Sequence, residues 1–366
     1  MEKIPLLVPF MPTADQILPY LRQIDANRQY TNFGPLSRLL EQRLAETLSV
    51  GTENVTTVAN CTAGLELILQ ARGLAPGTPV LLPALTFVAT ATAVSRVGMQ
   101  PVIADVDSNS WSLTPEIARQ AASIYRIGAV MPVATFGRAQ DTAAWDAFER
   151  ETGIPVIIDA AGAFGNQSAG SRADVVFSFH ATKSFGAAEG GAVISPDPER
   201  IQWVRTLSNF GMDTRTSLLT SLGTNAKMSE YHCALGLASF DIWEKVKQHR
   251  RALHARYLDR LRAMPLGLEY QEKPADGIYT LMAVVLPEGK NATETGTQLA
   301  RFGIETRRWY SPALHQQPAL SACPIAGQLP VADLFSGRII GLPFFPGITD
   351  PQIEHVCESL CIALDP

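Results

Sequence analysis

Two residues in the middle of the chain, Lys183 and Asp159, have the types and spacing needed for chemistry on a carbonyl group. Lys183 lies between two apolar runs of strand length, Val175–Phe179 and Ala192–Ile194. An amine held where a buried strand ends is partly desolvated, which favours its neutral form, and a neutral amine can attack a carbonyl. Taken alone, Lys183 would be interpreted as an exposed loop lysine, so a second feature is needed.

That second feature is Asp159, which lies in an apolar run that starts at Pro155. A carboxylate at the end of a buried strand needs a cationic or hydrogen-bonding partner. Aspartate and lysine in this order, each near a strand end and one strand apart, suit pyridoxal 5'-phosphate (PLP). The lysine forms a Schiff base with the cofactor aldehyde, and the aspartate keeps the ring nitrogen protonated. We therefore predict Lys183 and Asp159 as the catalytic residues and PLP as the cofactor.

Longer motifs around these residues resemble one family of enzymes. The segment SFHATKSFGAAEGGAV contains the lysine, and IIDAAGAFG contains the aspartate. The motifs TNFGP, NCTAGLELIL, LPALTFVATATAV and LPFFPGITDPQI follow the family order, as does the stretch from Gly223 to Glu230. The chain resembles the DegT/DnrJ/EryC/StrS family of PLP-dependent nucleotide-sugar aminotransferases over nearly its whole length.

Composition and charge are those of a globular protein with a small-molecule substrate. The chain has 366 residues, a net charge of −5 and no basic stripe, which argues against a nucleic-acid partner. No apolar run is long enough to span a bilayer, and the N-terminus lacks a signal peptide. The five cysteines show neither metal nor disulfide spacing, so we expect no metal and a reduced, cytoplasmic protein.

The order of expected elements predicts an α/β fold with two domains. Short apolar strands alternate with helices through the first two thirds of the chain, which favours a mostly parallel sheet of about seven strands covered on both faces. The resemblance implies the type I aminotransferase fold. We expect a PLP-binding domain at 1–240, whose N-terminal segment can pack on a smaller C-terminal α+β domain at 241–366. The later elements are expected at Tyr231–Arg262 (one long helix, bent near Gly236–Ser239), Tyr279–Leu286 (strand), Asn291–Phe302 (helix), Ile304–Trp309 (strand) and Thr349–Leu364 (helix).

Several residues are predicted to bind the cofactor. Thr62 and Ala63 lie where a helix starts after a strand, which is a ready site for a phosphate, although Asn60 or Thr62 could simply cap that helix. The resemblance implies that Phe87 stacks on the PLP ring and that Ser178 contacts the phosphate. It also implies that Asn225 reaches the phosphate of a neighbouring subunit, and therefore a homodimer with shared active sites.

Substrate residues follow from the resemblance and from side-chain chemistry. In the family, the turn containing Asn32 and Gly34 lines the active site, and Lys227 stands where an arginine is common. A later segment borders the nucleotide-sugar, and arginine suits its diphosphate because the guanidinium bonds bidentately. Each of these residues could instead cap a helix, pack or be solvated. The candidates from this segment are Arg307, Arg308, Tyr310 and His315.

The resemblance implies transfer of an amino group from L-glutamate to a keto-sugar carried on a nucleoside diphosphate, for a cell-surface polysaccharide or a natural product. Two alternatives stay open: another PLP-dependent sugar modification such as dehydration, and a non-catalytic PLP- or sugar-binding regulator. Retention of Lys183 argues against the dehydratases, which carry histidine there. One departure is Gly162, where the family has Gln or His bonded to the phenolic oxygen of the cofactor.

Overall fold

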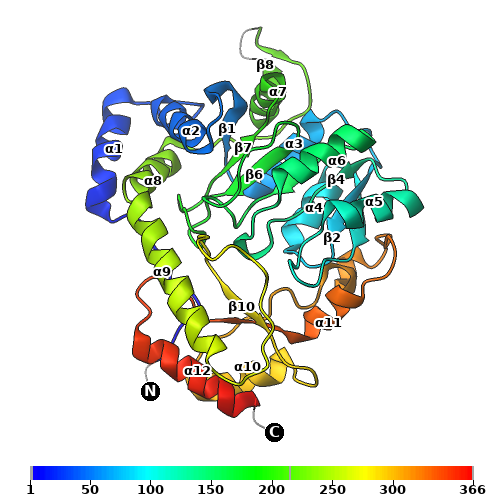
Figure 1. Ribbon diagram of the computed structural model, residues 1–366. Coiled ribbons are helices and arrows are strands. Elements are labelled where there is room, and N and C mark those ends of the chain that lie inside the picture. The colour runs from blue at the N-terminus through cyan, green and yellow to red at the C-terminus, as the bar shows by residue number, and fades with distance from the viewer. Residues whose placement is uncertain (1–2, 214–215, 365–366) are drawn as a thin grey trace.

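A mixed sheet forms the centre of the molecule (Figure 1). The computed structural model describes residues 3–213 and 216–364. Four strands pair in the order β1 (Val55–Val58), β7 (Gly191–Ile194), β6 (Asp174–Ser178) and β5 (Ile157–Asp159), and three more in the order β3 (Gln100–Ala104), β2 (Pro79–Pro83) and β4 (Ala129–Val130). Parallel bridges from Val130 to Val156 and from Val133 to Asp159 join the two groups. Strand β7 runs antiparallel to both neighbours, and the other pairs are parallel.

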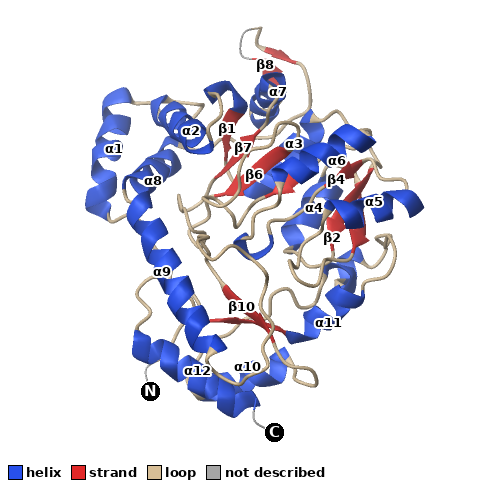
Figure 2. Ribbon diagram, in the orientation of Figure 1, coloured by secondary structure: helices blue, strands red, loops and turns tan. Residues whose placement is uncertain are grey.

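Helices cover both faces of this sheet (Figure 2). Successive strand residues point to opposite faces, so Val175 and Val176 belong to different hydrophobic clusters. One face carries α2 (Pro35–Leu48), α5 (Pro115–Ile124), α6 (Thr142–Thr152) and α8 (Glu230–Asp241), and the other α3 (Cys61–Ala71), α4 (Val88–Arg96) and α7 (Pro198–Ser208). The expected α/β fold with a largely parallel, doubly covered sheet is confirmed.

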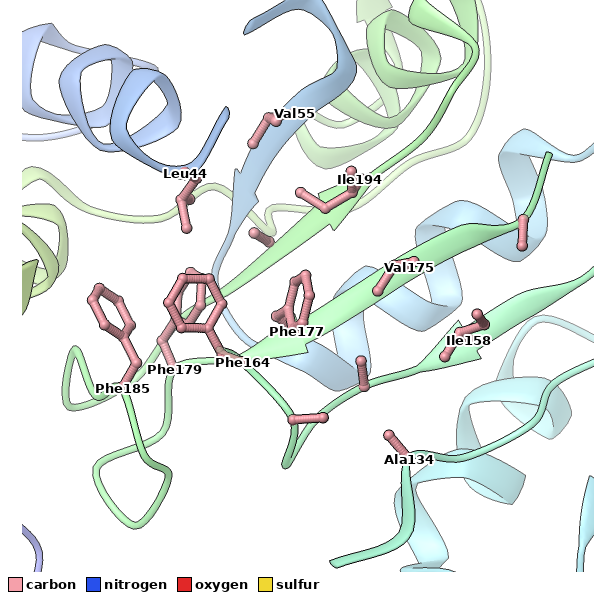
Figure 3. Close-up of a cluster of buried hydrophobic side chains, with 14 of the residues drawn as sticks. Leu44, Val55, Ala134, Ile158, Phe164, Val175, Phe177, Phe179, Phe185 and Ile194 are labelled. Atoms are coloured by element: carbon pink, nitrogen blue, oxygen red, sulfur yellow. The ribbon is translucent and has the colours of Figure 1, made fainter. Parts of the chain in front are cut away.

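An aromatic cluster anchors the loop between β6 and β7, which carries Lys183 (Figure 3). Phe179 precedes the lysine and Phe185 follows it, and their rings lie 5.1 Å apart between centroids. Phe164, in the segment after β5, packs edge-on against Phe177 at 5.3 Å and Phe179 at 5.6 Å. Because these side chains are buried on both sides of the loop, the backbone around Lys183 has little freedom to move.

The later part of the chain has its own hydrophobic cluster at the base of the molecule in Figure 1. This part of the chain contains α9 (Trp243–Arg262), β10 (Met282–Val285), α10 (Ala292–Arg301), α11 (Pro330–Arg338), β11 (Ile339–Leu342) and α12 (Asp350–Leu364). Of these, α11 packs into other clusters through Ala332 and Phe335. Ile4 bridges to Ile304, and the amide of Phe344 donates to the carbonyl of Leu6, so the N-terminal segment lies against this cluster. The division at residue 240 stays a proposal.

Three expected elements differ in the structure. The helix expected from Tyr231 to Arg262 is two helices that meet at Ile242, so the bend expected near Gly236–Ser239 is wrong. The chain turns at Ile242 because Trp243, the first residue of α9, packs on the ring of Phe164 at 5.6 Å. The strand expected from Ile304 to Trp309 is reduced to isolated bridges, and that from Tyr279 to Leu286 shortens to β10.

Some elements were not anticipated from the sequence. They are α1 (Ala14–Asn27), α7, α11, β11 and a short hairpin of β8 (Met212–Asp213) with β9 (Leu218–Leu219). The connecting segments also contain single 3₁₀ turns at Thr52–Asn54, Thr135–Gly137, Leu314–Gln316 and Pro318–Leu320. In the described ranges, 3–213 and 216–364, none of the helices is both long and apolar enough to cross a membrane.

Candidate active site

The candidate catalytic residues gather at the carboxyl edge of the parallel strands. Asp159 is the last residue of β5, and Ser178 is the last residue of the neighbouring β6. Helix α3 begins at the same edge after β1, and Phe87 follows β2. Ligands of doubly wound α/β proteins bind at this edge because loops from several strands converge there. The chain therefore brings its predicted cofactor residues to one end of the sheet.

Asp159 is a buried carboxylate held by neutral donors. It is 4% exposed, and it accepts hydrogen bonds from the Thr90 hydroxyl at 2.8 Å and the Ala161 amide at 3.1 Å. Burial raises the pKa of Asp159, and the hydrogen bonds and the nearby charge of Lys183 offset this only in part. Such an acid is stabilised by a cationic group placed beside it.

Lys183 is positioned by bonds within its own loop. Its amide donates to the carbonyl of His180 at 2.9 Å, and the amide of Ala181 donates to that of Ala188 at 2.9 Å across the loop. The imidazole Nδ1 of His180 lies 2.8 Å from the Thr182 hydroxyl. The side chain of Lys183 is half-buried, and its charge is close enough to Asp159 to offset part of the rise in the pKa of that carboxyl. Lysine and aspartate thus form one electrostatic pair.

The start of α3 lies beside this pair. Asn60 caps the helix, accepting a hydrogen bond from the amide of Ala63 at 2.9 Å, so this amide is already occupied. Among the described residues, the amides of Cys61 and Thr62 have no acceptor, as is usual in a first helical turn. Cys61 is buried within electrostatic range of Asp159 and Lys183, which places this helix end near both. The geometry suits an anion, and Thr62 and Ala63 stay predicted phosphate residues.

An aromatic pair lies over the same edge. Phe87 is 55% exposed although it is apolar, and its ring lies 6.5 Å from that of Tyr310. Tyr310 stacks on Phe136 at 5.4 Å. Burial and then the charge of Asp159 raise the pKa of Tyr310, so its phenol stays neutral and lies near the carboxylate. An open aromatic face beside a buried acid is a suitable bed for a planar ring.

The turn before α2 has a structural explanation of its own. Asn32 and Phe33 both have positive φ angles, 64° and 55°. The buried carboxylate of Glu230 accepts hydrogen bonds from the amides of Leu36 at 2.8 Å and Ser37 at 2.9 Å at the start of α2. A Cβ on Gly34 would lie 2.6 Å from the carboxyl carbon of Glu230. Gly34 is therefore required for close packing, and its contact with substrate stays a prediction.

Asn225 and Lys227 lie in the segment that leads into α8. Asn225 is exposed and pairs through its backbone with Asn209, while the next residue, Ala226, accepts a hydrogen bond from the amide of Ala59. The ammonium of Lys227 donates to Asn209 Oδ1 at 2.9 Å and lies 4.7 Å from the ring centroid of Phe210. The hydrogen bond between Ala226 and Ala59, which lies just before α3, places both residues beside the start of that helix.

The remaining candidates differ in their surroundings. Tyr310 is brought to Asp159 and Phe87, as described above. Arg307 is exposed, and its guanidinium lies 4.8 Å from the ring of Trp309. Arg308 donates to the Thr293 hydroxyl in α10 at 2.8 Å, and His315 pairs with Asp333 at 2.8 Å. The side chains of Arg308 and His315 thus bond to Thr293 and Asp333, and their substrate roles stay predictions.

Sequence reasoning missed three residues that build the site: Thr90, which holds Asp159; Phe136, which supports Tyr310; and Glu230, which anchors α2. Thr86 and Thr90 are four residues apart and bond each other at 3.0 Å, a spacing visible in the sequence. Their partner Asp159 lies 69 residues away, so only the fold reveals it.

The residues fit PLP. Among the described residues, the buried Asp159 has no ion-pair partner, and Lys183 lies close to it. Free amides lie at the start of α3, and the ring of Phe87 is open to solvent. These four groups suit the ring nitrogen, the aldehyde, the phosphate and the ring face of PLP. At Gly162 a Cβ would lie 3.5 Å from the amide nitrogen of Gly137, an ordinary contact. The backbone there does not demand glycine.

Comparison with known proteins agrees with this geometry. The model of the DegT/DnrJ/EryC1/StrS aminotransferase family matches residues 13–361. A UDP-2-acetamido-2-deoxy-3-oxo-D-glucuronate aminotransferase of Pseudomonas aeruginosa is 30% identical, covering 94% of this chain and 95% of the relative. A dTDP-3-amino-3,4,6-trideoxy-alpha-D-glucose transaminase of Streptomyces venezuelae is also 30% identical, and the match covers 84% of this chain and 82% of the relative.

Solved structures are similar along the whole chain. The structure of DesI with its TDP-sugar product has a TM-score of 0.89 at 30% identity and covers 100% of this chain and 93% of that one. A structure from Bacillus cereus, named for a PLP-dependent aminotransferase, has a TM-score of 0.91 at 30% identity and covers 98% of this chain and 100% of that one. The chain belongs to the DegT/DnrJ/EryC1/StrS aminotransferase family and is a PLP-dependent transaminase.

Proposed function

We propose that this chain transfers an amino group from L-glutamate to a keto-sugar linked to a nucleoside diphosphate. The observation that carries the proposal is the buried Asp159 coupled to Lys183 at the carboxyl edge of the sheet. Relatives that match nearly end to end are named for UDP-linked and dTDP-linked sugars, which supports a nucleotide-sugar acceptor. The sugar, the nucleotide and the carbon aminated are left to experiment.

Each residue has a distinct task in this reaction. Bound PLP supplies an aldehyde for the amino group and a ring that accepts electrons. Asp159 holds a proton at the ring nitrogen, and Thr90 fixes the orientation of its carboxylate. Lys183 would hold the cofactor through its amine and, as a free base, would move the proton at the donor's alpha carbon. Phe87 and Tyr310 would exclude water from one side of the cofactor ring. Release of 2-oxoglutarate before the sugar binds gives ping-pong kinetics.

Exposed apolar residues support a homodimer. The hairpin of β8 and β9 and its flanks carry Phe210, Leu218, Leu219 and Leu222, and Leu222 is 84% exposed. Such a group of apolar side chains is typical of a protein–protein interface. Asn225 follows β9 after a short segment, 220–224, and the resemblance to the family implies that a second copy seated there would bring Asn225 toward the partner's cofactor. We further propose a cytoplasmic location, because the five cysteines show neither metal nor disulfide spacing in the sequence.

The function is tested by offering glutamate with a panel of nucleotide-linked 3-keto and 4-keto sugars and detecting amino-sugar product by mass. Equal amounts of 2-oxoglutarate and amino-sugar are expected. Binding of PLP or sugar without any 2-oxoglutarate would favour a regulator, and a dehydrated sugar without amine transfer would favour the other sugar-modifying reaction.

Sharing of the site is tested separately by mixing Lys183→Ala protomers with Asn225→Ala protomers. A shared site gives one intact and one doubly altered site per hybrid, so activity partly returns. Absence of recovery in proven hybrids would contradict sharing.

A further inference from the structure

A cavity lies between α9 and the chain that leads into β10. Both elements lie toward the base of the molecule in Figure 1. Its volume is about 380 Å³, which is enough for a small organic molecule. Leu258 and Met282 supply apolar walls, and His254, Gln271 and Lys273 supply polar groups. Neither Lys183 nor Asp159 lines it.

Two buried side chains in its wall have polar atoms without partners. His254 is 2% exposed, and neither of its ring nitrogens has a hydrogen bond among the described residues. Gln271 is 6% exposed, and its Oε1 is likewise unpartnered, although its Nε2 donates to the carbonyl of Ser110 at 2.8 Å. Buried polar atoms normally have partners because leaving one unpaired costs about 1–3 kcal/mol. Their side chains therefore point to a missing ligand.

Cationic side chains outnumber carboxylates in the lining of the cavity. The ammonium of Lys273 lies over the ring of Tyr279, 4.0 Å from its centroid, and forms no ion pair with the described carboxylates. Arg262 lines the rim above the ring of Tyr270. Glu272 also lines the cavity, but its side chain is exposed to solvent.

The ionisation of these groups agrees with their surroundings. Burial lowers the pKa of Lys273 to about 7, because no anion offsets the loss of solvent around its ammonium. Burial, and then the charges of Lys273 and Arg262, lower the pKa of His254 to about 3. The imidazole is therefore neutral near pH 7 and offers one donor and one acceptor.

We propose that this cavity is a binding site for a small organic anion with an apolar body. Its negative group pairs with Lys273 and accepts a hydrogen bond from His254, which gives one of the unpartnered ring nitrogens a partner. The apolar body lies against Leu258 and Met282. The proposal is independent of the aminotransferase reaction, since none of these residues contacts the catalytic pair.

The methyl group of Met282 provides a local reporter for the test. The full chain, loaded with PLP, is labelled with ¹³C at its methionine methyl groups, and the Met282 resonance is assigned from the Met282→Leu variant. Benzoate is the probe, neutral benzamide its uncharged match, and inorganic phosphate an anion without an apolar body. Because Met282 lines this cavity, its resonance responds most directly to a probe bound there.

We expect benzoate to move the Met282 resonance saturably, with at least tenfold weaker binding of benzamide and of phosphate. Lys273→Gln should weaken benzoate binding at least tenfold. Lys245→Gln, an exposed lysine on α9 outside the cavity, should leave it unchanged. An unmoved Met282 resonance at every soluble benzoate concentration would overturn the site. Equal binding of benzamide would overturn the anionic preference, and equal binding of phosphate would overturn the apolar one.

A second variant tests the role of the unpartnered His254 imidazole without relying on an assigned resonance. His254→Phe keeps an aromatic ring against Tyr279 and removes both unpartnered nitrogens. We expect a higher melting temperature without benzoate and loss of the upward shift that benzoate gives the parent protein. A lower melting temperature together with an undiminished benzoate shift would contradict the role given to His254.

Discussion

Asp159 and Asp174 are carboxylates on adjacent, parallel strands, yet their surroundings are opposite. Asp174 begins β6 and lies beside Ile157, whereas Asp159 ends β5 and lies beside Val176, so they occupy opposite edges of the sheet. Asp174 is fully buried and bonds to Arg72 at 2.6 Å and Arg200 at 2.9 Å. Asp159 is nearly as buried, but its direct hydrogen bonds come from the neutral groups of Thr90 and Ala161.

The difference distinguishes a carboxylate whose charge the fold compensates from one whose charge is compensated only in part. Two guanidinium groups compensate the charge of Asp174, and Arg72 also pairs with Glu149 at 3.0 Å. The charges at this edge of the sheet are therefore balanced within the fold. The pKa of Asp159 is raised because its compensation is incomplete. The charge of such an acid can be compensated by a cationic group of a ligand, such as a protonated pyridine nitrogen.

The largest effect is expected from removing the lysine that faces Asp159. Lys183→Ala should abolish turnover, because no other described lysine is coupled to Asp159, and should remove the absorbance of covalently held cofactor. The fold should persist, since the side chain is only half-buried. Glutamate-dependent 2-oxoglutarate formation and the cofactor spectrum are the measurements. Turnover like that of the parent protein would refute the assignment of Lys183.

At the opposite edge, Asp174→Asn should affect stability instead. It leaves Arg72 and Arg200 buried without their shared carboxylate, which typically costs about 3–5 kcal/mol. Urea unfolding measures this loss, and the rate per folded molecule should stay within twofold of the parent. Asp197→Asn is the matched control, because Asp197 pairs with the same Arg200 at 43% exposure and should cost less than about 1 kcal/mol. A rate loss in Asp174→Asn larger than its loss of folded protein would contradict the comparison.

A smaller effect is expected from the neutral donor that holds Asp159. Thr90→Val removes the 2.8 Å hydrogen bond to the carboxylate and should raise the pKa of Asp159 further, because that bond lowers it. A hydrogen bond to a charged group contributes about 1.5–3 kcal/mol, so a loss of roughly tenfold or more in rate is expected. Thr92→Val on the exposed side of α4 is the control. Equal rates for the two variants would show that Thr90 does not hold Asp159 in the working enzyme.

The smallest effect is expected at Gly162. Its backbone is not left-handed and a Cβ would make an ordinary contact, so Gly162→Gln should fold, retain cofactor and change the rate by about tenfold or less. Gly165 is the contrasting position: its φ is 92° and a Cβ would lie 2.7 Å from Ile278, so Gly165→Ala should destabilise the protein. Loss of cofactor by the Gly162 variant would mean that this site requires glycine.

The sequence predicts the sheet well and indicates Lys183 and Asp159 as a candidate pair, because both inferences depend on local pattern. Lys183 and Asp159 each stand next to a short apolar strand, and the strands that carry them are adjacent in the sheet. Thr90 and Phe136 were missed because their partners are distant in sequence. The break at Ile242 was misplaced because helix propensity carries no information on how Trp243 packs against Phe164.

The substrate residues illustrate the same limit. Arg308 and His315 have suitable chemistry in the sequence, but Thr293 and Asp333 bond to them in the fold. Tyr310 was one candidate among several, and only tertiary packing brings it to Asp159. Residue type therefore predicts what a side chain can do, whereas the packing of distant segments decides where it does so.

The most direct test of the contrast is Asp159→Asn, measured for rate with cofactor and for unfolding free energy without it. The rate should fall about 10³-fold, because a neutral amide does not keep the ring nitrogen protonated. The cofactor-free protein should be as stable as the parent or more so at pH 7. Since the pKa of Asp159 is raised by folding, its ionised form opposes folding above the ordinary carboxyl range, and the amide removes that cost. A rate within tenfold of the parent, or a stability loss as large as that of Asp174→Asn, would contradict the account.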